Sequence, residues 1–132
     1  MSEIVYSQEY ERRAYAPPMP VLDIGVSRPG ASAPSATLEA VVDTGADGTL
    51  IPQDVLEGVG ATFVDRAYLR GITGQRRPVD LYLVTLHLGP LRIAGVRAVA
   101  LAPRDTAILG RDVLNQLDIA LRGIAGVTEV LK

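Results

Sequence analysis

Apolar residues along this chain recur at alternate positions in short runs, a pattern typical of strands rather than of long helices. Clusters of Gly, Pro and Ser separate the runs and favour turns and loops. Strands are predicted at residues 21–26, 37–42, 62–69, 78–88 and 91–101, and a terminal hairpin at 117–121 and 127–131. The pattern therefore predicts an all-β fold.

Two short stretches depart from this alternation and favour helices. Residues 52–57 fit a brief helix that Gly58 and Gly60 would end. Residues 111–117 predict a second short helix, because their apolar side chains would share one face. Only the second of these enters the fold class that we expect, which is all-β with one short C-terminal helix.

The N-terminal residues differ from the rest of the chain in composition. Residues 1–19 are charged, carry three tyrosines and close with a Pro-rich spacer. We treat residues 1–19 as an N-terminal arm and residues 20–132 as a single domain. The tyrosines would either pack the arm onto a neighbour or lie in a loosely ordered tail.

Composition narrows the classes of function. The 132 residues suit one domain, and a hydrophobic fraction of 48% supports a buried core. The net charge of −2 argues against nucleic acid as the main partner. Without cysteine the chain has no disulfide, thiolate metal site or Cys nucleophile. Lys132 is the sole Lys among 13 basic residues, a bias that reflects codon composition and hints at a bacterial origin.

The sequence carries no mark of export or of membrane insertion. Its N-terminus lacks a basic region followed by an apolar core, and no apolar run approaches the length of a membrane span. We therefore expect a cytoplasmic protein without a membrane partner.

One carboxylate occupies an unusual position, in a tight polar turn directly after an apolar run. Asp43-Thr44-Gly45 follows the strand predicted at 37–42, and this order lets the chain reverse while the carboxylate points out of the turn. Gly45 supplies the freedom of φ that such a reversal needs. Downstream, residues 107–115 give two bulky apolar residues, a Gly and the start of the second helix.

Three motifs in this order resemble the retropepsin-like aspartic protease family. They are Asp43-Thr44-Gly45-Ala46-Asp47, the glycine-containing hairpin at 68–76, and Ile108-Leu109-Gly110-Arg111-Asp112. The resemblance extends from about residue 20 to residue 131. It implies a barrel-like acid protease fold that assembles as a homodimer, with the hairpin at 68–76 serving as a flap over the site.

The resemblance also implies roles for individual residues. Asp43, Thr44 and Gly45 would form the catalytic turn, with the Thr44 hydroxyl bonding to the backbone of the other subunit. Asp47 and Arg111 would form a partly buried ion pair that braces the site, and Asp47 would also meet the substrate backbone. The implied substrate-binding residues are Ala46, Asp47, Gly71, Ile72, Thr73, Gly74 and Ile108.

Chemistry of this kind needs two carboxylates that share one proton. One accepts a proton from water while the other donates to the scissile carbonyl. This chain has one Asp-Thr-Gly, and in the nearest second candidate, Asp105-Thr106-Ala107, Ala cannot replace Gly in the same reversal. We therefore expect a symmetric homodimer with its site at the interface, acting on a peptide or protein substrate without a metal or other cofactor.

Residues near the turn and the hairpin lead to two further expectations. Because Ala46 has no hydroxyl to donate to an ionised carboxylate, we expect an activity optimum nearer weakly acidic than strongly acidic pH. Subsites lined by Ile72, Val79, Leu101 and Ile108 would favour an extended peptide with apolar side chains flanking the cleaved bond.

Each assignment has a plainer alternative. Asp43 could cap its own turn, Asp47 and Arg111 could be two solvated charges, and residues 71–74 could be an ordinary hairpin tip. His87 has no second His to complete a metal or triad site and is read as structural. For the whole chain, the alternatives are a catalytically weak retropepsin-like dimerisation or peptide-binding module, and a monomer that needs a partner chain.

Overall fold

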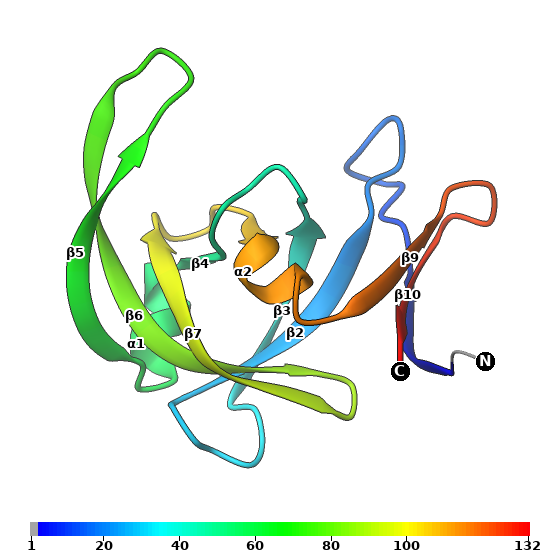
Figure 1. The fold of residues 1–132 in the computed structure, drawn as a ribbon, viewed down its shortest axis with the longest axis horizontal. Coiled ribbons are helices and arrows are strands. Elements are labelled where there is room, and N and C mark those ends of the chain that lie inside the picture. Colours follow the sequence, from blue (N-terminus) through cyan, green and yellow to red (C-terminus); the bar gives the residue numbers. More distant parts are fainter. Residues whose placement is uncertain (1–2) are drawn as a thin grey trace.

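The computed structural model describes residues 3–132, which form two β-sheets and two short helices (Figure 1). The elements in chain order are β1 (Ile4–Glu9), β2 (Val21–Ser27), β3 (Ala36–Val42), β4 (Leu50–Pro52), α1 (Gln53–Gly58), β5 (Thr62–Arg70), β6 (Arg76–Leu88), β7 (Leu91–Leu101), β8 (Ala107–Leu109), α2 (Arg111–Leu114), β9 (Asp118–Arg122) and β10 (Val127–Leu131). The all-β prediction is confirmed.

Six strands close into a barrel. Their order is β2-β3-β8-β4-β7-β6, and a further antiparallel pairing of β6 with β2 joins the two ends. Strand β5 pairs with β6 outside this ring, so that the β5–β6 hairpin extends beyond the barrel wall (Figure 1). Closure removes the exposed edges that an open sheet of these strands would leave.

The barrel encloses the hydrophobic core. Alternation along the strands sends one set of side chains inward, where Leu22, Ile24, Leu86, Leu88 and Leu109 are fully buried. Full burial of an aliphatic side chain of this size stabilises the fold by about 1.5–3 kcal/mol. The core therefore supplies a rigid support for the loops at the barrel ends.

The position of β8 dictates the path of the connection between β3 and β4. Strand β8 lies between these two strands, parallel to β3 and antiparallel to β4. Residues 43–49 must therefore cross over the carboxyl end of β8, directly above the residues that begin α2. This crossing brings the two motifs at 43–47 and 108–112 together.

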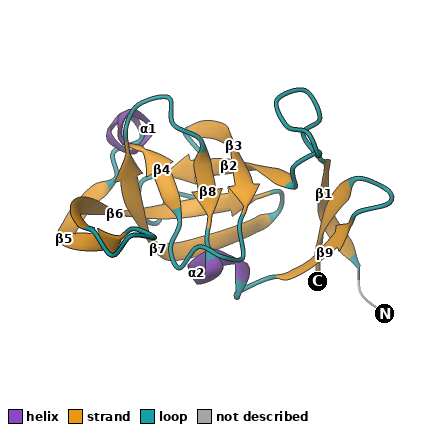
Figure 2. Cartoon of the chain, turned by 90° about the horizontal axis from the view of Figure 1, so that it is seen from above, coloured by secondary structure: helices purple, strands orange, loops and turns teal. Residues whose placement is uncertain are grey.

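A second, three-stranded sheet joins the two ends of the chain, in the order β1-β10-β9. Figure 2 shows it beside the barrel. The sequence pattern predicts no strand at residues 4–9, and β1 forms because it pairs with β10, for example Gln8 with Thr128. The Tyr6 hydroxyl also donates a hydrogen bond of 2.9 Å to the Asp23 carbonyl, which ties this sheet to the barrel.

The structure has two short helices, where the expected fold class has one. Helix α1 packs the fully buried Leu56 into the core, and this burial stabilises the helix. Helix α2 ends at Leu114, earlier than the predicted 117, because the chain must already turn into β9. Within residues 3–132 neither helix has the length and apolarity of a membrane span.

Candidate active site

The turn after β3 holds the Asp43 carboxylate by its own backbone. The Gly45 N–H donates to Asp43 Oδ1 at 2.9 Å, and the Ala46 N–H donates to the Asp43 carbonyl at 3.2 Å. The Asp43 N–H in turn donates to the Leu109 carbonyl of β8 at 3.1 Å. Asp43 is partly buried, while Thr44 and Gly45 are exposed, so that the carboxylate lies at the surface on a fixed support.

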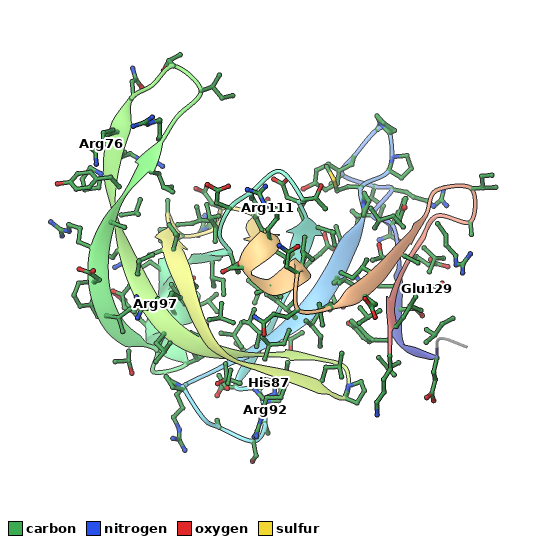
Figure 3. All side chains as sticks on the ribbon, viewed as in Figure 1. Arg76, His87, Arg92, Arg97, Arg111 and Glu129 are labelled. Carbon is green, nitrogen blue, oxygen red and sulfur yellow. The ribbon has the colours of Figure 1, made fainter. Side chains whose placement is uncertain are left out.

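Arg111 at the start of α2 binds the same turn (Figure 3). Its Nη1 donates to the Thr44 carbonyl at 2.7 Å, its Nη2 pairs with the Asp47 carboxylate, and its backbone N–H donates to the Ala46 carbonyl at 2.9 Å. The Asp47 side chain is 94% exposed, more than the partly buried pair that we expect. An ion pair this exposed contributes little stability by itself, so the two backbone carbonyls carry most of the bracing in a single chain.

A buried threonine completes the connection between the turn and α2. Thr49 is fully buried, and its Oγ1 donates to Asp112 Oδ1 at 2.8 Å and accepts from the Gly110 N–H at 3.1 Å. The sequence motifs predict no role for Thr49 or Asp112. The available signal was a hydroxyl at the end of a polar turn, just before the apolar Leu50, but the contact is hidden because its partners lie 63 positions apart in the sequence.

The hairpin tip is built as a tight turn. The Gly71 N–H donates to the Gln75 carbonyl at 2.8 Å, and Gly74 has φ +83°, a conformation that favours glycine. Residues 71–74 are all exposed. Hairpin tip and turn 43–49 project from the same side of the barrel in Figure 1, but among the described residues no hydrogen bond or ion pair joins them.

A groove of about 420 Å³ runs between the stem of the β5–β6 hairpin, the end of β7 and the loop before β8. Val79 and Leu101, which we expect in subsites, line it, whereas Ile72 lies at the tip and Ile108 in β8 away from it. Its lining also includes Leu69 and Val99, for which the sequence predicts no place in a subsite.

Other chemistry-bearing groups lie apart from this turn. Asp105, in the nearest alternative to Asp43-Thr44-Gly45, is exposed in the loop before β8. Within residues 3–132 no three His, Cys, Asp or Glu residues gather as metal ligands. The arrangement around Asp43 is therefore one positioned carboxylate per chain, braced by Arg111, which suits acid–base chemistry once a second carboxylate is supplied.

Comparison with known proteins gives a family match. The family model described as "Aspartyl protease" matches residues 31–113, a span that holds turn 43–49, the β5–β6 hairpin and β8. No curated protein matches the chain.

The fold is also similar to a solved structure, described as the crystal structure of a retropepsin-like aspartic protease from Rickettsia conorii. The TM-score is 0.63 with 12% identity, over 99% of this chain and 94% of that one. At this identity the similarity shows the fold alone. Because the family model covers more than half of the chain and the fold agrees with it, the chain belongs to the retropepsin-like aspartic protease family.

Proposed function

We propose that the protein is an aspartic endopeptidase whose site forms between two copies of the chain, each contributing Asp43. The main support for this proposal is the carboxylate of Asp43, which the Gly45 N–H holds in place at an exposed turn. One chain supplies one such turn, so a two-fold axis through this face is the simplest way to complete the pair.

The two carboxylates would divide the work of hydrolysis. The ionised Asp43 accepts a proton from a water molecule, whose oxygen attacks the scissile carbonyl carbon, while the protonated Asp43 donates to the carbonyl oxygen. The resulting tetrahedral intermediate collapses as a proton passes to the leaving nitrogen and the C–N bond breaks. Two carboxylates at such close range cannot both be ionised, so sharing one proton is their natural state.

Neighbouring groups would hold the turns and the substrate. The exposed Thr44 hydroxyl makes no hydrogen bond within residues 3–132, which leaves it available to the backbone of the facing turn. The exposed carboxylate of Asp47, paired with Arg111, would be covered in the dimer and would meet substrate backbone there. Ala46 and Ile108 would border the cleaved bond, and the flap residues 71–74 would close over it.

Cleavage of a diverse peptide library by the wild type and by Asp43→Asn tests the proposal, with the assembly of both followed by sedimentation. Asparagine keeps the shape but cannot ionise, so we expect a rate lower by at least about a hundredfold in a protein that still dimerises. Asp54→Asn, on the exposed face of α1, removes the same charge and should keep full activity.

Two results would contradict the proposal. A dimeric wild type that cleaves nothing at any pH would favour a peptide-binding or dimerisation module. Equal activity of Asp43→Asn and wild type would place the chemistry elsewhere on the chain.

A further inference from the structure

Charge is distributed unevenly over the chain, with a concentration of arginine on the β5–β6 hairpin. Four of the 13 basic residues, namely Arg66, Arg70, Arg76 and Arg77, lie within residues 66–77, while all 15 acidic residues lie elsewhere in a chain of net charge −2. The hairpin is thus a cationic projection on an otherwise acidic protein, on the same side of the barrel as turn 43–49 (Figure 1).

Most of this charge is not neutralised within the chain. Arg66 pairs with Asp80, Nε to Oδ1 at 3.2 Å. Arg76 lies over the ring of Tyr68, 4.9 Å from its centroid, and projects from the hairpin stem in Figure 3. Among the described residues, Arg70, Arg76 and Arg77 have no carboxylate within ion-pair distance, so the hairpin offers cationic groups to a ligand.

Arg77 is the unpaired arginine that borders the groove at the hairpin stem. In the lining of that groove Val79 and Val99 are buried, whereas Arg77 is exposed. Buried valines beside an unpaired arginine suit a ligand side chain that has an aliphatic stem and an anionic end. Glutamate has this construction.

We propose that this groove binds a glutamate side chain of the substrate through Arg77, which makes acidic peptide segments the preferred substrate class. This inference rests on the proposed endopeptidase function. In a symmetric dimer the second hairpin adds an equal cationic charge over the site and attracts acidic segments further.

One acidic group opposes this preference. Asp105, in the loop before β8, also lines the groove and repels an incoming carboxylate. Asp80 lines it too, but its charge is matched by Arg66. Arg77 and Asp105 therefore act on a bound glutamate with opposite sign, which gives the experiment two variants with opposite expected effects.

The experiment uses a parent peptide that the wild type cleaves, with Glu or Gln placed in turn at each position flanking the cleaved bond. For the wild type at low salt we expect kcat/KM to favour Glu over Gln by about two- to fivefold at one position. Arg77→Gln should abolish this ratio, and Asp105→Asn should increase it. Arg97→Gln removes an exposed arginine of β7 outside the groove and should leave the ratio unchanged.

Three negative results would lead to three different conclusions. If no peptide is cleaved, the proposed function fails and the inference falls with it. If peptides are cleaved but Glu and Gln are equivalent at every position, the endopeptidase stands and the glutamate site is refuted. If Arg97→Gln lowers the ratio as much as Arg77→Gln does, the preference comes from general charge and the groove is not its source.

Discussion

At the scale of single residues, the closest packing in the candidate site lies between two glycines. A Cβ added to Gly110 would lie 2.4 Å from the Gly48 carbonyl oxygen and 2.5 Å from its carbon. Both atoms belong to the backbone of turn 43–49, which crosses above β8 and cannot move without shifting Asp43. A side chain at position 110 would therefore clash with the crossing turn, which explains why the motif has glycine there.

Gly110→Ala should destabilise the protein by about 1–3 kcal/mol, because overpacking against backbone forces the turn to shift. The change is measured as the shift of the urea unfolding midpoint. Gly58→Ala, at the end of α1 where a Cβ would meet nothing within 4 Å, is the matched control and should be neutral or slightly stabilising. Equal midpoints for Gly110→Ala and wild type would show that the turn does not lie against Gly110.

Within the candidate site, the residues that belong to short sequence motifs are the easiest to predict. Asp43 and Arg111 each belong to a short local pattern, and the structure places them in one turn-and-helix arrangement. Thr49 and Asp112 escape prediction because nothing near either residue in the sequence indicates its partner. The exposure of Asp47 also could not be predicted, since it depends on which face the fold leaves open.

At the scale of elements, the pairing of β2 with β6 closes the barrel and holds the sole histidine on its outer face, since the flanking Leu86 and Leu88 point into the core. His87 lies opposite Gly25 in this pairing and is 9% exposed, with Nε2 2.9 Å from the buried Ser27 Oγ. Burial lowers the pKa of His87 below its ordinary value of 6.5, and the nearby charge of Arg92 lowers it further. The lowered pKa favours a neutral imidazole at this position.

This burial makes stability depend on pH. Because the folded pKa lies below 6.5, the unfolded chain binds more protons than the folded chain between the two values. The contribution of His87 to stability is thus complete above about pH 6.5 and is lost as the pH falls through the folded pKa. His87→Gln cannot take up this proton, so its free energy of unfolding should fall less than that of the wild type between pH 7.5 and pH 5.

Urea unfolding of both proteins at the two pH values measures this difference. Other titrating groups, such as Glu39, whose burial raises its pKa, are common to both proteins and cancel in the comparison. Parallel losses of stability in wild type and His87→Gln would contradict the prediction.

Elements with a strong local pattern are predicted well, and those that depend on distant partners are not. The alternation at 37–42 and the glycines at 71 and 74 locate β3 and the hairpin tip closely. Strand β1 is missed because it exists through its pairing with β10 at the other end of the chain. The groove is found only in part, because its walls come from segments far apart in sequence.

At the scale of the whole molecule, the barrel presents one braced carboxylate and one cationic hairpin on the same side. A single copy leaves the Thr44 hydroxyl without a hydrogen bond among the described residues and the Asp47–Arg111 pair exposed. A second copy packed against this face would accept the Thr44 hydrogen bond, cover the Asp47–Arg111 pair and supply the second carboxylate. We therefore propose that activity belongs to a pair of chains in which both Asp43 residues are intact.

Subunit mixing tests whether activity needs both Asp43 residues of a pair. Wild-type protein is exchanged with a ninefold excess of Asp43→Asn protein, and peptide cleavage is measured per wild-type chain. With random pairing, about one wild-type chain in ten keeps a wild-type partner, so activity per wild-type chain should fall to about a tenth. An equal excess of Asp54→Asn, which is itself expected to be active, should instead raise activity per wild-type chain about tenfold. Unchanged activity in the Asp43→Asn mixture would contradict a site built from two Asp43 residues.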